Sequence, residues 1–414
     1  MYPMVRLKNP IKHYDWGSPE WIPQLLGEAN PQGLPWAELW MGVHPEGPSR
    51  IEYGGSALSL FQLIDQDPAR YLGEAAARAF GTLPFLFKLL AAEKPLSIQA
   101  HPNQEQAQQG WERENQLQIP LDAPQRNYKD PQHKPEIICA LSPFKALCGF
   151  REPERIVRGL VAFSQSAPEP LGSALGSLVK TLYAGDTAQA LRAFLQGLFG
   201  LPREIRQAIS AYGIHGQGEL IAHHAEYQEE WKLLGSFAAL HPEDPAVLAP
   251  LYLNRIDLAP GEGIYLPAGV LHAYIRGFGV ELMASSDNVL RGGLTAKHVD
   301  TEELVRILDF AAFHPQVLKP QGICYPTPAR EFSLWTLEGS GDQVQHLERL
   351  PVILIVTQGT LRLSCAGEEG EWILHQGASV FISAAFSLRP EALRFSGTYT
   401  LYAAGIGCEN TGGC

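Results

Sequence analysis

The chain contains few cysteines, six in 414 residues. They are Cys139, Cys148, Cys324, Cys365, Cys408 and Cys414. None forms a C-x-x-C pair and all are scattered, which argues against both a disulfide framework and a thiolate zinc site. A reducing compartment is therefore the default, and we expect the protein to be cytoplasmic.

Long apolar runs are missing as well. No stretch of 18 apolar residues occurs in the sequence, so we expect no membrane-spanning helix. The N-terminal segment MYPMVRLKNPIKHYDWG lacks a continuous apolar stretch, which argues against a signal peptide.

Positive charge is also in short supply, because the formal net charge is −12. This balance makes nucleic acid and anionic membranes unsuitable partners. A phosphorylated substrate would need a local cluster of Lys and Arg inside its pocket. The hydrophobic content of 45% and charged content of 18% are ordinary for a globular protein, and the length predicts two or three domains.

The chain divides into segments that differ in composition and in the spacing of apolar residues. Residues 1–150 are rich in Pro, Gly and short apolar runs, as expected for short strands and loops. Residues 151–250 carry Ala, Leu, Gln and Glu at helical spacing and predict a helical insertion, with one helix opening at Asp186-Thr187 and another carrying Pro202 in its first turn. A pattern typical of strands returns at 251, and a helix is expected over 301–313. The remainder to 414 is typical of a sandwich or small barrel.

Two predicted strands carry polar residues among apolar ones. Alternate residues of a strand face opposite sides, so KPLSIQAHP places Ser97, Gln99 and His101 on one face, opposite Leu96, Ile98 and Ala100. In PEIICAL, Glu136 shares a face with Ile138 and Ala140, whereas Ile137, Cys139 and Leu141 face away. An unpaired carboxylate at the mouth of such an apolar strand would be costly to desolvate, and a metal ion would remove that difficulty.

A third segment, GEGIYLPAGVLH, contributes His272. Together with Gln99, His101 and Glu136 it supplies one amide oxygen, one carboxylate and two imidazoles, a plausible ligand set for Zn²⁺. Each residue alone has an ordinary structural explanation, such as a hydrogen-bonded amide or a buried histidine. The prediction therefore depends on convergence of the three strands.

The same segment belongs to a weak internal repeat. The matched positions are Gly261, Pro267, Gly269 and His272 in the first copy, and Gly377, Ser383, Ala385 and Leu388 in the second. Because leucine replaces the histidine, we predict that the second unit kept the fold and lost the metal.

The spacing Gly261-x5-Pro267-x-Gly269-x2-His272 matches the second signature of the cupin superfamily. In the first signature, Gln99 stands where a histidine is usual, and this departure resembles the type I phosphomannose isomerases. The resemblance covers nearly the whole chain in seven segments taken in order. They are HYDWG (13–17), LPFLFKLL (83–90), LSIQAHPN (96–103), NYKDPQHKPEIICAL (127–141), ALCGF (146–150), YLPAGVLHAY (265–274) and SSDNVLRGGLTAKHVD (285–300).

The resemblance implies a mainly β fold with an α-helical domain: two cupin-like (jelly-roll) barrels plus a helical insertion. Residues 1–150 and 251–315 would form the zinc-binding catalytic cupin domain, 151–250 the helical domain, and 316–414 a C-terminal cupin-like domain without metal. The implied activity interconverts mannose 6-phosphate and fructose 6-phosphate through a cis-enediolate. We expect a monomer.

Residue by residue, the resemblance assigns one Zn²⁺ per chain to Gln99, His101, Glu136 and His272. It places the catalytic arginine at Arg291, where the cation would stabilise a sugar oxyanion or bind phosphate. The predicted substrate-binding residues are Lys88, Ser97, Lys134, Glu281, Asp287 and Lys297.

Several of these assignments keep an alternative. Lys88 contacts phosphate or substrate, or else snorkels at a strand edge. Lys134 reaches a substrate oxygen or is a loop charge, and Ser97 contacts phosphate or supports Gln99. Glu281 and Asp287 face the barrel or pair with Arg291.

Other questions stay open from sequence. Trp16 lines the pocket or only packs. The general base is Glu281, Asp287, Lys134 or a zinc-bound water. Two other functions compete: another cupin metalloenzyme, such as an Fe or Cu oxygenase, and a non-enzymatic sugar-binding bicupin.

Overall fold

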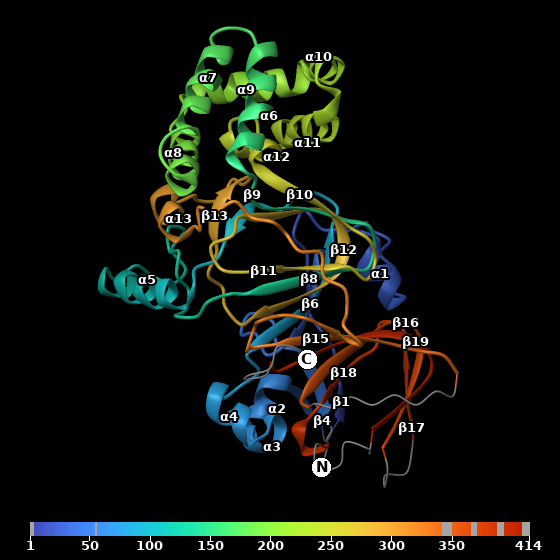
Figure 1. Ribbon diagram of the computed structural model, residues 1–414. Helices are drawn as coiled ribbons and strands as arrows, with labels where there is room; N and C mark the ends of the chain where they lie inside the picture. Colours follow the sequence, from blue (N-terminus) through green and yellow to red (C-terminus); the bar gives the residue numbers. More distant parts are fainter. Residues whose placement is uncertain (1–3, 54–55, 342–349, 366–370, 387–392, 408–414) are drawn as a thin grey trace.

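The structure is a computed structural model, and it describes residues 4–53, 56–341, 350–365, 371–386 and 393–407. Figure 1 shows three tiers. A group of helices lies at the top, a large sheet fills the middle, and a second sheet lies at the lower right.

The middle tier is a ten-stranded sheet whose strands pair antiparallel. Its strands are β2 (Ile11–Lys12), β3 (Glu38–Gly42), β6 (Phe85–Ala92), β7 (Ile98–Ala100), β8 (Glu136–Ala140), β9 (Phe144–Phe150), β10 (Leu253–Leu258), β11 (Gly263–Leu266), β12 (His272–Ala284) and β13 (Leu290–Gly293). The long strand β12 pairs with β6, β7, β8 and β9. One strand thereby connects segments that are far apart in the sequence.

The second sheet has seven strands. They are β1 (Met4–Arg6), β14 (Cys324–Tyr325), β15 (Ser333–Gly339), β16 (Val352–Cys365), β17 (Glu371–His375), β18 (Ser379–Ile382) and β19 (Leu393–Gly405). Strand β1 comes from the N-terminal end of the chain and pairs with β18, a contact that the sequence did not indicate. A separate hairpin joins β4 (Arg50–Tyr53) and β5 (Ser56–Ser59).

Seven α-helices lie between β9 and β10 and form the top tier (Figure 1). They are α6 (Pro153–Ser166), α7 (Leu171–Thr181), α8 (Thr187–Phe199), α9 (Arg203–His215), α10 (Gln217–His223), α11 (Gln228–Leu240) and α12 (Ala249–Tyr252). Helix α8 opens at Asp186 as the sequence predicted, and this residue also forms a capping box with Gln189. Pro202, expected in the first turn of α9, instead occupies the position just before it.

Helices also occur where strands and loops were expected in the first 150 residues. These are α1 (Trp21–Leu26), α2 (Leu60–Gln66), α3 (Pro68–Leu72), α4 (Glu74–Phe80) and α5 (Gln104–Gln116). Helix α13 (Thr301–Ile307) is shorter than the predicted span of 301–313. No helix among the described residues is both long and apolar enough to cross a bilayer.

One hydrophobic core joins the two sheets. Phe85, Ile137 and Val280 of the ten-stranded sheet pack with Phe332 and Ile353 from the C-terminal part of the chain. All five side chains are fully buried. The two sheets therefore share one hydrophobic interface.

The cysteines differ from expectation at one position. Cys139 and Cys148 are free and buried, but Cys324 is disulfide-bonded. The scattered spacing did not predict this bond.

Candidate metal centre

The predicted metal ligands come together through strand pairing. In register, His272 at the start of β12 faces Gln99 of β7, and Met283 further along β12 faces Glu136 of β8. His101 directly follows β7. Strand pairing thus brings His272 beside Gln99, 173 residues earlier in the chain.

A glycine turn fixes the start of β12. Gly269 has φ +76, and its amide donates to the His101 carbonyl at 2.8 Å. A Cβ at this position would lie 3.1 Å from the Ile307 carbonyl oxygen and 3.0 Å from the Asp309 nitrogen. Only glycine fits both the left-handed backbone and the close approach, so the turn depends on it.

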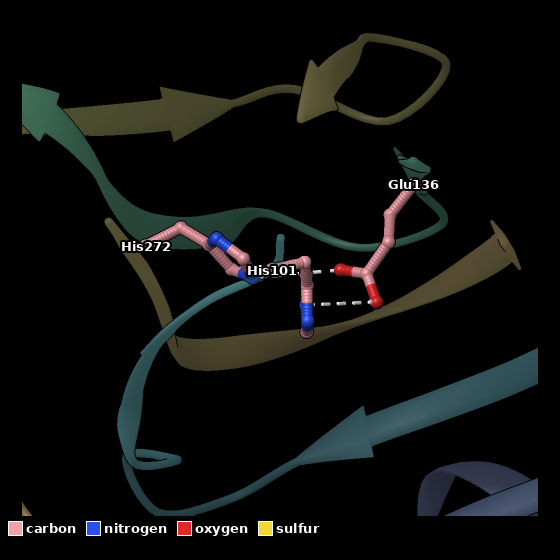
Figure 2. A group of neighbouring side chains, drawn as sticks. All are labelled: His101, Glu136 and His272. Carbon is pink, nitrogen blue, oxygen red and sulfur yellow. Dashed lines mark ion pairs between the residues drawn. The ribbon is translucent and has the colours of Figure 1, made fainter. Parts of the chain in front are cut away.

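Two imidazoles and one carboxylate form a compact group (Figure 2). His101 Nε2 lies 3.3 Å from Glu136 Oε1, and His272 Nε2 lies 3.4 Å from Glu136 Oε2. One possible ligand atom from each of the three residues lies within 4.8 Å of the others. Each residue is only 1% exposed, so these groups are almost fully removed from bulk water.

The outer ring nitrogens fix the orientation of both histidines. His101 Nδ1 lies 2.6 Å from the Asn288 carbonyl, and His272 Nδ1 lies 3.0 Å from the Val270 carbonyl. In a neutral ring, Nδ1–H donates to the carbonyl and leaves a lone pair on Nε2. Burial lowers the pKa of His101 to about 4, against the opposing attraction of Glu136, so this ring is neutral at pH 7.

The group fits a zinc ion. The buried atoms His101 Nε2 and Glu136 Oε2 have no hydrogen-bond partner, which is costly unless something else satisfies them. Burial alone would raise the pKa of Glu136, but Lys134 and the histidines lower it well below its usual range, so it is an anion. Two neutral imidazole nitrogens and one carboxylate are ligands typical of Zn²⁺.

Gln99 lies beside the group as predicted. Its Nε2 is 3.5 Å from His272 Nε2, and a flip of the amide would present the oxygen instead. Gln99 can therefore offer the fourth ligand atom.

A cavity of about 660 Å³ opens over this group. Its wall includes Gln99, Glu136 and the predicted catalytic Arg291, together with most of the predicted substrate-binding residues, namely Lys88, Ser97, Lys134, Glu281 and Lys297. Asp287 is not part of the wall: its carboxylate contacts His44 Nε2 at 3.1 Å, and its side chain is 46% exposed.

Lys88 is the centre of a buried charge cluster. Its Nζ lies 3.0 Å from Glu281 Oε2 and 3.5 Å from Glu38 Oε1, and the residue is 7% exposed. Burial opposes the charge, yet the two carboxylates raise the pKa of Lys88 above its usual value. Strand β6 is paired on both sides, by β3 and β12, so a lysine snorkelling at a strand edge is excluded.

Lys134 is also more than a loop charge. Its Nζ lies 3.1 Å from Glu136 Oε1, and the residue is 7% exposed. It lines the cavity directly beside the candidate metal ligand.

Arg291 in β13 pairs in register with Gln99. Burial lowers the pKa of its guanidinium. Glu281 and Asp287 were considered as its partners, but they contact Lys88 and His44 instead. Within the described part of the chain, Arg291 has no hydrogen-bond or ion-pair partner, so its charge is available to a ligand.

Some residues of the site were not singled out from the sequence. Glu38 lines the cavity, and its one signal was a charge within the otherwise apolar run AELWMGV (37–43). Asn288, inside the matched segment 285–300, is fully buried and holds His101 through its carbonyl. Leu240 and His241, at the end of α11, bring the helical tier into the cavity wall.

Trp16 fulfils both roles that were considered for it. It lines the cavity, packs against the hydrophobic core beneath, and stacks on Tyr14 with ring centroids 5.6 Å apart.

The fold and site together define a β-rich metalloenzyme class, with a buried ion-binding group beneath an open polar cavity. A sequence profile described as phosphomannose isomerase type I, catalytic domain, matches residues 4–153. The chain is 36% identical over 390 residues to mannose-6-phosphate isomerase of Escherichia coli (strain K12), covering 92% of this chain and 95% of the relative. It is 33% identical over 411 residues to the Homo sapiens enzyme, covering 91% and 93%.

Solved structures agree with the sequence relatives. Mannose 6-phosphate isomerase from Salmonella typhimurium, bound to its substrate fructose 6-phosphate and zinc, superposes with a TM-score of 0.86 at 35% identity, covering 98% of this chain and 100% of the other. A zinc-bound mannose 6-phosphate isomerase gives a TM-score of 0.85, also at 35% identity and with the same coverage. The chain belongs to the type I phosphomannose isomerase family, which confirms the resemblance carried by the seven motifs.

Proposed function

We propose that this chain is a zinc-dependent aldose–ketose isomerase that interconverts mannose 6-phosphate and fructose 6-phosphate. The observation that carries the proposal is the buried His101–Glu136–His272 group with its unsatisfied atoms beneath a polar cavity. Gln99 completes the proposed ligand set, one zinc per chain.

The two sheets are proposed to be cupin barrels. The signature spacing and the ligand positions support this for the first sheet. The domain limits remain those expected from sequence: 1–150 with 251–315, 151–250, and 316–414 without metal. A cytoplasmic monomer also remains an expectation.

The proposed reaction moves a proton between C1 and C2 of the open-chain sugar through a cis-enediolate. Zinc, when bound, supplies a Lewis acid for the sugar oxygens. Arg291 adds a second positive charge, and its guanidinium, which has no partner among the described residues, can stabilise the charge that develops on oxygen. Burial in the cavity wall strengthens that interaction because little water competes.

Phosphate binding falls most naturally to Lys297. It lies exposed in the cavity wall, and in the described part of the chain no side chain pairs with its ammonium group. Ser97, in the same wall, offers a hydroxyl donor. Lys88 is already neutralised by two carboxylates and Lys134 by one, so they suit sugar oxygens better than phosphate.

For the general base, the geometry favours Glu281 over Asp287. Glu281 lines the cavity, and burial raises its pKa against the opposing effect of Lys88. A raised pKa brings a carboxylate closer to the range in which a base works best at neutral pH. Asp287 is outside the wall, and Lys134 and water remain alternatives for this step.

A coupled assay tests the function. Purified protein with one zinc per chain should convert mannose 6-phosphate to fructose 6-phosphate and should turn over unphosphorylated mannose far more slowly. No turnover of the phosphosugar would favour the sugar-binding bicupin. Iron or copper in place of zinc, with oxygen consumption, would favour a cupin oxygenase.

A further inference from the structure

The segment 129–135 brings Lys134 into the cavity and leads directly to Glu136 in β8. It has neither helical nor strand structure. At its end, the Ala284 amide donates to the Pro135 carbonyl at 3.1 Å. Before Lys134, side chains from other parts of the molecule hold the segment in place.

Two of these anchors come from elements near the first sheet. Asn288 accepts from the Lys129 amide at 2.7 Å and donates to the Gln132 carbonyl at 2.8 Å. Gln104, in the first turn of α5, donates to the Pro131 carbonyl at 2.8 Å and accepts from the His133 amide at 3.3 Å. These contacts hold the backbone up to residue 133.

The third anchor comes from the C-terminal part of the chain. His133 Nε2 donates to Glu331 Oε1 at 2.9 Å, and the two residues are 198 positions apart. His133 immediately precedes Lys134, so this contact is the last one before the cavity.

Glu331 is itself firmly placed. It lies just before β15, and the next residue, Phe332, is fully buried in the core shared by the two sheets. The side chain of His133 is 27% exposed, whereas that of Glu331 is 11% exposed. Glu331 is therefore the more buried partner of the pair, anchored beside the shared core, and His133 is the more exposed one.

The burial of Glu331 has a cost that the packing does not explain. Its Oε2 is buried and has no hydrogen-bond partner. Burial would raise the pKa of this carboxyl, but the hydrogen bond from His133 lowers it, so it remains an anion. An incompletely satisfied buried carboxylate is unfavourable for stability, and such costs are tolerated where function gains.

We propose that Glu331 is a positioning residue: it acts through His133 to hold Lys134 and Glu136 in their places at the cavity. The C-terminal sheet thereby takes part in the activity that the first sheet carries. This inference rests on the proposed isomerase function.

The test is a double-mutant cycle on the zinc-loaded full chain with mannose 6-phosphate. Glu331→Ala should lower kcat about 10-fold with KM changed less than about twofold, in the range known for residues that orient metal ligands. His133→Ala should do the same. The double variant should be no slower than either single variant, because each single change already removes the His133–Glu331 hydrogen bond.

Two further variants serve as controls. Arg203→Ala removes an exposed ion pair with Glu243 in the helical tier and should leave kcat unchanged. Glu331→Gln keeps an oxygen that accepts from His133 and should restore at least half of the kcat lost in Glu331→Ala. A general weakening of the fold would not produce this pattern of non-additivity and rescue.

Opposite results are readily distinguished. Wild-type kcat in Glu331→Ala, or losses that multiply in the double variant, would overturn the positioning role while leaving the isomerase function intact. An inactive wild-type protein would instead contradict the proposed function. If Glu331→Ala does not fold, His133→Ala alone decides, and an unchanged kcat there overturns the proposal.

Discussion

The two sheets differ most in what fills their interiors. The strands of the first sheet bury ionisable side chains, namely Glu38, Lys88, Glu136, His272 and Glu281. The second sheet encloses an apolar cluster that includes Leu354, Leu361 and Phe395. In the described strands of that sheet, the buried polar side chains are serines, Ser333 and Ser379.

The apolar interior of the second sheet favours stability, whereas the polar interior of the first sheet favours ligand binding. In an apolar interior, every buried group stabilises the folded state, and close packing leaves no room for a ligand. A polar interior must compensate each charge with a partner or an ion. The first sheet carries this cost and in return holds a cavity.

The internal repeat shows where the two sheets diverge. Gly261 and Gly377 both adopt left-handed backbones, with φ +83 and +85, and each precedes a four-residue strand, β11 or β18. After the strand, Gly269 forms a turn, whereas Ala385 lies in the 3₁₀ helix η3 (Ala384–Phe386). Leu388, the predicted counterpart of His272, lies outside the described residues, so loss of the metal there stays a prediction.

The largest effect is expected when His272 of the first sheet is replaced by leucine, the residue at the matching position of the second repeat unit. His272→Leu removes one imidazole and should abolish zinc binding, with kcat falling about 10³-fold or more, beyond the 10- to 100-fold typical of outer-shell residues. Metal analysis and the isomerase assay measure both. A variant that keeps one zinc and near-normal kcat would remove His272 from the site.

Arg291→Gln should lower kcat about 10²-fold, the usual effect of removing one group that stabilises transition-state charge. Zinc content should not change, because the guanidinium is not a metal ligand. Lys297→Gln is the matched comparison and should mainly raise KM for the phosphosugar. Equal effects of both changes on KM alone would reassign Arg291 to substrate binding.

Lys88→Met tests the cost of a charged interior. Glu281 and Glu38 would lose their cation, so the free energy of unfolding should fall by about 3–5 kcal/mol, measured by urea denaturation. Leu354→Ala in the second sheet should cost about 2–5 kcal/mol but leave kcat of the folded enzyme unchanged. A loss below about 1 kcal/mol for Lys88→Met would show that the cluster is not buried in solution.

A smaller effect is expected from pH on the metal-free protein. The pKa of His101 is lowered from 6.5 in the unfolded chain to about 4 in the folded one. The unfolded chain therefore binds more protons in this window, so stability is complete above pH 6.5 and is lost as pH falls toward 4. The lowered pKa of Glu136 adds a loss of the same sign below pH 4.5.

Urea midpoints of the metal-free protein at about pH 7 and about pH 5 provide the measurement, since these values lie on either side of the ordinary histidine pKa. His101→Ala should reduce the difference between the two midpoints. If wild-type midpoints do not differ, then His101 is not held neutral by burial.

The sequence predicted the site best where strands are regular. In β8, Glu136, Ile138 and Ala140 face the interior of the first sheet, and Ile137 and Cys139 face the shared core, as alternation required. In contrast, β7 spans only three residues. Leu96 lies before it and lines the cavity with Ser97, although alternation had placed the two on opposite faces.

Contacts between residues far apart in the sequence could not be predicted from strand alternation. Glu38 reaches Lys88 only because β3 pairs with β6, and Asp287 turns to His44 in a loop where alternation does not apply. The contact between His133 and Glu331 joins positions 198 residues apart, and no local pattern marks it.

The central claim is that the polar interior of the first sheet holds one zinc ion on which the reaction depends. Its most direct test is to remove metal with a chelator and titrate zinc back while measuring isomerisation of mannose 6-phosphate. The rate should vanish on chelation, rise linearly with added zinc and reach its plateau at one zinc per chain. Full activity in metal-free protein, or a plateau at two, would contradict the claim.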